Sequence, residues 1–173
     1  MTQEEKRGLT RRELLTKAAS VSALALIGIG FICAPTGAWA MEVKVIKPEE
    51  MATLLQMARD IYPHDQVADQ FYAVAVKGYD ADDKKALVEA GIAELDTAAK
   101  ALGHASYAAI GWEEDRVKVL QSVEKTTFFQ TVRAGLVTGL YNQKEVWPIF
   151  GYEGESYSQG GYIARGFDDI NWL

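Results

Sequence analysis

Between residues 48 and 147, hydrophobic residues recur at intervals of three and four, and this spacing most constrains what the chain can fold into. Such spacing places apolar side chains along one face of an α-helix. The first segment opens with Pro48, Glu49 and Glu50, where the missing N–H of proline is harmless and acidic side chains favour the positive end of the helix dipole. The sequence therefore predicts a helix that begins at Pro48 and is stopped by Pro63.

Four further segments have the same spacing. They cover about residues 67–77, 80–102, 113–123 and 126–145. We expect Asp80 or Asp82 to cap the third helix and Gly103 to follow its end. In the second helix we expect one side to be apolar, formed by Phe71, Val74 and Ala75. In the fifth, the small residues Thr131, Gly135 and Gly139 form a stripe that lets another backbone approach closely.

Alternation typical of strands occurs only at residues 43–45. The sequence predicts an all-α fold, a small bundle of about five helices over residues 41–150, with an extended tail rich in glycine and aromatic residues over 151–173.

The N-terminus has the organisation of an export signal over residues 1–40. Arg11 and Arg12 precede an uncharged run over residues 18–34. Paired arginines ahead of an apolar run are typical of a twin-arginine signal, which predicts export of the folded chain to the periplasm by the twin-arginine translocase.

A cleavage site is expected between Ala40 and Met41, because Ala38 and Ala40 place small residues at the two positions that signal peptidase reads. The alternative is a retained membrane anchor, since the run of 17 residues is at the lower limit for a spanning helix. Cleavage would remove five basic and three acidic residues and leave 133 residues with a formal charge of −8.

Charge and cysteine content exclude several classes of function. The whole chain has a formal charge of −6, so we expect no nucleic-acid partner, because binding to phosphates needs a basic surface. Cys33 is the single cysteine and lies in the predicted signal. The mature domain would therefore have no thiolate ligand for an iron–sulfur cluster and no disulfide.

The last 23 residues have an unusual composition. They include five glycines, which disfavour a regular helix, and an aromatic residue at every fifth position: Tyr152, Tyr157, Tyr162, Phe167 and Trp172. Burying five aromatic side chains would contribute about 25 kcal/mol, whereas ordering the backbone would cost about 23–46 kcal/mol. We therefore expect the tail to order against a partner, with packing along its own bundle as the alternative.

The residues suggest no catalytic, cofactor-binding or metal-binding constellation in this chain. The two histidines, His64 and His104, are far apart, and no zinc-ligand spacing is present. A free-standing enzyme that uses His64 with Asp65 stays open as a minor alternative.

Two stretches resemble the small-subunit family called gluconate 2-dehydrogenase subunit 3. They are the sequence ARDIYPHD at residues 58–65 and the ending GGYIARGFDDINWL at 160–173. The resemblance extends from about residue 49 to the C-terminus, and the twin-arginine leader agrees with it.

The resemblance implies a non-catalytic subunit that stabilises a large flavoprotein of the glucose–methanol–choline type and carries it through export. That partner holds FAD and often an iron–sulfur cluster, oxidises sugars, sugar acids or glycosides, and commonly passes electrons to a membrane cytochrome c. We expect the partner interface to involve Tyr62, His64, Tyr152, Tyr157, Gly160, Gly161, Tyr162, Arg165, Phe167 and Trp172. A periplasmic chaperone or binding module for an unrelated redox protein is the main alternative.

Overall fold

The structure is a computed structural model that describes residues 25–26, 30–34, 39–165 and 167. Its described part contains five α-helices, which confirms the predicted small helical bundle. The helices are α2 (Pro48–Ile61), α3 (Asp69–Val76), α4 (Asp82–Ala101), α5 (Glu113–Val123) and α6 (Thr127–Tyr141). A short 3-10 helix, η1 (Lys77–Tyr79), lies between α3 and α4. Two more follow α6: η2 (Trp147–Phe150) and η3 (Ser156–Gln159).

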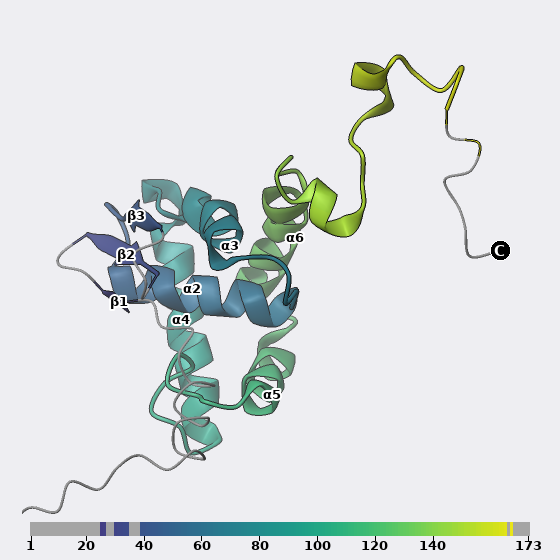
Figure 1. Ribbon diagram of the computed structural model, residues 1–173. Coiled ribbons are helices and arrows are strands. Elements are labelled where there is room, and N and C mark those ends of the chain that lie inside the picture. The colour runs from purple at the N-terminus through teal and green to yellow at the C-terminus, as the bar shows by residue number, and fades with distance from the viewer. Residues whose placement is uncertain (1–24, 27–29, 35–38, 166, 168–173) are drawn as a thin grey trace, which may run out of the picture.

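Helix α2 is the centre of the bundle. It contacts α3, α4, α5, α6 and strand β2 (Phe31–Cys33), and Figure 1 shows it crossing the middle of the molecule. Its inward side chains Met51, Leu54, Leu55, Met57 and Ala58 are fully buried. The helix predicted to begin at Pro48 is therefore confirmed.

Helices α3 and α6 pack closely through the predicted small-residue stripe. At Gly139 an added Cβ would lie 3.0 Å from the backbone oxygen of Ala75, so a larger side chain would force the helices apart. Over Gly135, the Tyr79 hydroxyl donates a hydrogen bond of 3.0 Å to the carbonyl oxygen of Thr131. The expectation of close backbone approach at this stripe is confirmed.

The predicted apolar side of α3 is only in part its buried side. Phe71 and Ala75 are partly buried and pack against the core. Tyr72, Ala73 and Val76 are buried, whereas Val74 is 58% exposed. The segment from Phe71 to Val76 is apolar on every side, so periodicity alone could not identify the face that points inward.

The expected cap of α4 is wrong. The N-cap is Ala81, which makes no side-chain cap bond, and Asp82 is the first helical residue. Asp80 instead accepts hydrogen bonds of 2.8, 2.8 and 3.1 Å from the backbone N–H groups of residues 44–46. Burial acts to raise the pKa of Asp80, but these three donors outweigh it and lower the pKa. Asp80 thus ties the segment before α2 to the start of α4.

A small antiparallel sheet lies beside α2 and was not predicted. Its strands are β1 (Ala25–Leu26), β2 and β3 (Ala40–Glu42), in the order β1-β2-β3. The residues expected to alternate as a strand, 43–45, follow β3 and are not a strand themselves, because the N–H groups of 44 and 45 bond to Asp80.

No helix in the described residues is both long and apolar enough to cross a membrane.

Candidate partner interface

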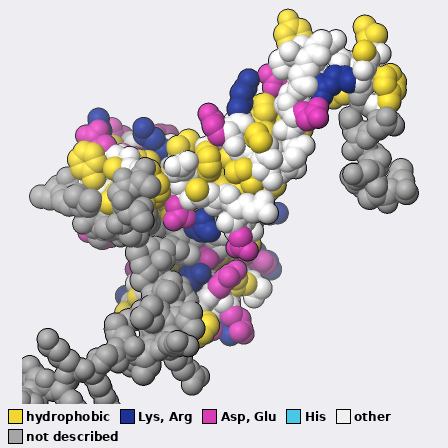
Figure 2. All heavy atoms as spheres, viewed as in Figure 1, with side chains coloured by type: hydrophobic (Ala, Val, Ile, Leu, Met, Phe, Trp, Pro, Cys, Tyr) yellow, Lys and Arg dark blue, Asp and Glu magenta, His cyan; other side chains and the backbone are white. Residues whose placement is uncertain are grey.

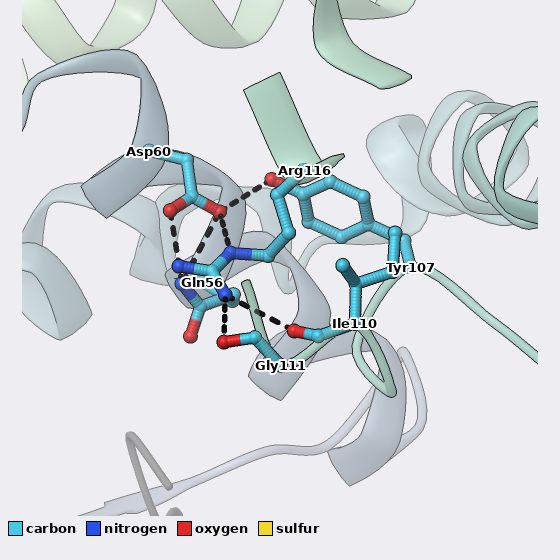
Figure 3. Close-up of polar contacts among 6 residues, drawn as sticks. All are labelled: Gln56, Asp60, Tyr107, Ile110, Gly111 and Arg116. Carbon is cyan, nitrogen blue, oxygen red and sulfur yellow. Dashed lines mark hydrogen bonds and ion pairs between the residues drawn. The ribbon is translucent and has the colours of Figure 1, made fainter. Parts of the chain in front are cut away.

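The end of α2 holds a buried polar cluster (Figure 3). Asp60 accepts hydrogen bonds from the Tyr107 hydroxyl at 2.6 Å and from Nε of Arg116 at 2.8 Å. Gln56, one turn earlier, donates to both carboxylate oxygens at 3.1 and 3.2 Å. The side chains of Asp60 and Arg116 are only 4% and 11% exposed. These contacts join α2, the α4–α5 loop and α5.

The donors of this cluster bond to acceptors of the elements that surround it. Arg116 Nη1 also donates to the carbonyl oxygen of Ile110 at 3.0 Å, and the backbone N–H of Tyr107 donates to Asp96 at 2.9 Å. Burial, followed by the charge of Asp60, raises the pKa of the Tyr107 hydroxyl well above its usual value. Tyr107 therefore stays neutral and donates to Asp60, and this hydrogen bond holds the α4–α5 loop against α2.

The neighbouring Arg59 fixes the next turn of chain. Its Nη1 donates to Asp69 at 2.6 Å and to the carbonyl oxygen of Val67 at 3.2 Å, and its guanidinium lies 5.0 Å from the ring centre of Tyr72. The Tyr72 hydroxyl in turn donates to the carbonyl oxygen of Tyr62. The loop from α2 to α3 is therefore held from both sides.

Two rings of this loop meet rings from the end of α6 and from the segment around η2. We call this cluster the aromatic corner, formed by Tyr62, His64, Tyr141, Trp147, Phe150 and Tyr152. His64 Nε2 lies 2.6 Å from the Tyr141 hydroxyl, and its ring meets Phe150 edge-on at 4.9 Å between centres. Tyr62 meets Tyr141 edge-on at 5.7 Å. Burial raises the pKa of Tyr141 above its ordinary value, so the neutral hydroxyl is favoured further.

The outer side of the aromatic corner is hollowed. A cavity of about 390 Å³ is lined by Tyr141, Asn142, Trp147, Phe150 and Tyr152. Trp147 is fixed by its indole N–H, which donates to the carbonyl oxygen of Tyr141 at 2.8 Å, and its ring meets Tyr152 at 5.2 Å. Phe150 and Tyr152 remain 47% and 52% exposed. This surface is apolar and aromatic, and no other described segment covers it.

Beyond the aromatic corner the tail extends away from the bundle (Figure 1). Tyr157, Tyr162 and Phe167 are 93%, 67% and 77% exposed, and Figure 2 shows hydrophobic side chains protruding along this segment. These three aromatic side chains of the described part of the tail are therefore not buried against the bundle.

The tail has local structure of its own. Arg165 pairs with Glu153 across 12 positions, and the amide of Gln159 donates to the carbonyl oxygen of Glu153. Gly160 and Gly161, which we expect at the partner interface, have φ of +84° and +80°. Other residues rarely adopt this conformation, so the turn at this point of the tail requires glycine. Among the described residues, no hydrogen-bond partner lies near the buried Nη1 atom of Arg165.

The structure brings Tyr62, His64 and Tyr152 together at the aromatic corner, and places Tyr157, Gly160, Gly161, Tyr162, Arg165 and Phe167 along the extending tail. Arg11, Arg12, Ala38 and Trp172 lie outside the described residues, whereas Ala40 and Met41 lie in β3. Sequence reasoning missed Tyr141, Trp147 and Phe150. The signal that could have indicated a docking site is a tryptophan directly before the glycine-rich tail.

Within the described residues, no group of three or more histidine, cysteine, aspartate or glutamate side chains could hold a metal ion. His64 bonds to Tyr141 and forms no hydrogen bond or ion pair with Asp65 in the described part of the chain. Comparison of the chain with known protein families, curated proteins and solved structures found no match.

Proposed function

We propose that this chain is a non-catalytic small subunit of a periplasmic FAD-dependent sugar or glycoside dehydrogenase. In this role it stabilises the large flavoprotein and carries it, already folded, through twin-arginine export. FAD, and an iron–sulfur cluster where one is present, belong to the large subunit, and a membrane cytochrome c is the expected electron acceptor.

The observation that carries the proposal is the exposure of the tail aromatics. Monomeric proteins rarely leave such side chains in a contiguous solvent-exposed segment, and aromatic residues are enriched where interfaces form. The tail starts at the aromatic corner, which offers a fixed, half-exposed apolar surface. Together they form one candidate interface: a rigid aromatic base continued by a segment that extends toward a second molecule.

The buried cluster around Asp60 supports the same proposal from another side. Within the resembling stretch at residues 58–65, Asp60 bonds to Arg116 and joins α2 to α5. The adjacent Arg59 bonds to Asp69 and holds the loop before α3, which places Tyr62 and His64 in the aromatic corner. Those residues thus position a surface.

Co-purification tests the proposal. The tagged chain, expressed with its chromosomal neighbours intact, should bring down a large protein whose visible spectrum shows flavin. A colourless complex would favour the chaperone alternative, and a colourless monomer that turns over a sugar would favour the free-standing enzyme.

A tail variant tests the interface itself. Replacing Tyr157, Tyr162 and Phe167 with serine should weaken binding of the flavoprotein at least about 100-fold, because buried aromatic residues dominate interface energies. The control is Trp112→Ser, which removes another exposed ring (64%) at the start of α5, away from the tail. Equal affinities of the two variants would refute the tail interface.

Export of the partner gives the last test. Changing Arg11 and Arg12 to lysine should leave both chains in the cytoplasm, and continued export of the flavoprotein would refute joint export.

A further inference from the structure

The predicted processing bond lies inside a paired strand. Ala40 and Met41, between which cleavage is expected, are the first two residues of β3. In the antiparallel pairing with β2, Ala40 is opposite Cys33 and Met41 is opposite Ile32. The pairing continues on both sides, because the N–H of Ala34 bonds to the carbonyl oxygen of Trp39 at 3.0 Å and that of Val43 to Gly30 at 2.6 Å.

Strand β2 is also part of the hydrophobic core. Ile32 is fully buried and Cys33 is 2% exposed, although both belong to the apolar run of the predicted signal. Strand β2 contacts α2, and across the pair Met41 and Val43 are 8% and 4% exposed. The end of the predicted leader therefore packs as an element of the domain.

A protease binds its substrate as an extended, unpaired segment, which is why cleavage concentrates in exposed loops. The bond between Ala40 and Met41 is neither unpaired nor in a loop. Cutting it requires an opening that separates β2 from β3, and the rate then follows the population of that open form.

We propose that the folded domain shields its own processing bond, so that signal peptidase cuts between Ala40 and Met41 only after β2 has left β3. The inference rests on the export signal in the proposed function, but it does not involve the flavoprotein. Release of β2 would free the edge of β3 and uncover Met41 and Val43, so cleavage would remove β1 and β2, two of the three described strands, together with the leader.

The experiment compares cleavage of the purified full chain with that of a peptide spanning residues 31–50, using purified signal peptidase and intact mass to detect the product 41–173. The folded chain should be cut at least about 50-fold more slowly than the peptide. Ile32→Ala should accelerate cleavage of the folded chain at least about 10-fold, because it removes the side chain that holds β2 in the core.

The matched control is Ile110→Ala, which truncates an equally buried isoleucine (3% exposed) in the α4–α5 loop. It should change the cleavage rate less than about twofold, with circular dichroism used to show that both variants are folded. The proposal is overturned if folded chain and peptide are cut equally fast, if Ile110→Ala accelerates cleavage as much as Ile32→Ala, or if the peptide is not cut at this bond. Unchanged flavoprotein binding in the tail variant would refute the tail interface of the proposed function and leave this result unaffected.

Discussion

Replacing Arg116 with methionine should strongly destabilise the bundle. The change leaves the Asp60 carboxylate, 4% exposed, without its cationic partner, and it also leaves the Ile110 carbonyl without its donor. Removing one partner of a buried ion pair typically costs about 3–5 kcal/mol. Because Tyr107 and Gln56 still donate to Asp60, we expect the lower half of that range, about 3–4 kcal/mol.

Such a loss is a large fraction of the roughly 5–15 kcal/mol that stabilises an ordinary domain. Urea unfolding followed by circular dichroism at 222 nm measures it as a lower midpoint at constant slope. Lys118→Met is the control, since Lys118 pairs with Glu114 and Asp115 on the surface, and it should leave the midpoint unchanged.

A second substitution separates the effect of charge from that of packing. In the Arg116→Met background, Asp60→Asn removes the unpaired charge but keeps the shape, so it should recover about 1–2 kcal/mol. A loss below about 1 kcal/mol for Arg116→Met, or no recovery in the double variant, would refute the claim that the buried Asp60–Arg116 ion pair stabilises the packing of α2 against α5.

Three further predictions concern the rest of the fold. Asp80→Asn should lower the free energy of unfolding above about pH 5, because folding lowers the pKa of Asp80. The stability that Asp80 contributes is present above its unfolded pKa of about 3.9 and disappears as the pH falls through the lower folded pKa. The unfolding free energies of wild type and variant should therefore converge in an acid denaturation series. Gly91→Ala should cost about 1–3 kcal/mol in urea unfolding, since a Cβ there would lie 2.0 Å from the Phe128 ring, whereas Gly78→Ala, with open space around it, should be neutral; equal midpoints would contradict the close contact. Thr126→Ala should cost about 1 kcal/mol by the same measurement, because the Thr126 hydroxyl accepts the N–H of Phe129 at the start of α6.

The helices could be predicted because their signals are local. The bounds of α5 agree with the expected 113–123, and α2 begins and ends where proline requires. The predicted fifth helix, 126–145, is longer than α6, which ends at Tyr141, because the chain then turns toward η2 so that the Trp147 indole reaches the Tyr141 carbonyl. That contact is tertiary and leaves no periodic trace in the sequence.

The polar cluster and the sheet could not be predicted for a related reason. Arg116 is 56 positions from Asp60, and either residue alone reads as an ordinary charge on a solvated helix face. Strand β2 lies in a run whose apolar character already had an explanation as an export signal, so its pairing with β3 went unnoticed. Apolar composition indicates that a segment is buried away from water, but it does not show whether it is buried in a membrane or in the protein core.

The position of Trp147 has a practical consequence. Its ring lies against Tyr152 at the point where the chain leaves the bundle, and Lys144 lies 5.6 Å from its centre. The chain has four tryptophans, so a version that keeps only this one would emit light from the root of the tail. Any molecule that settles on that root would displace water from the indole and shift its emission to shorter wavelength, and the protein would thereby report its own docking without an added dye.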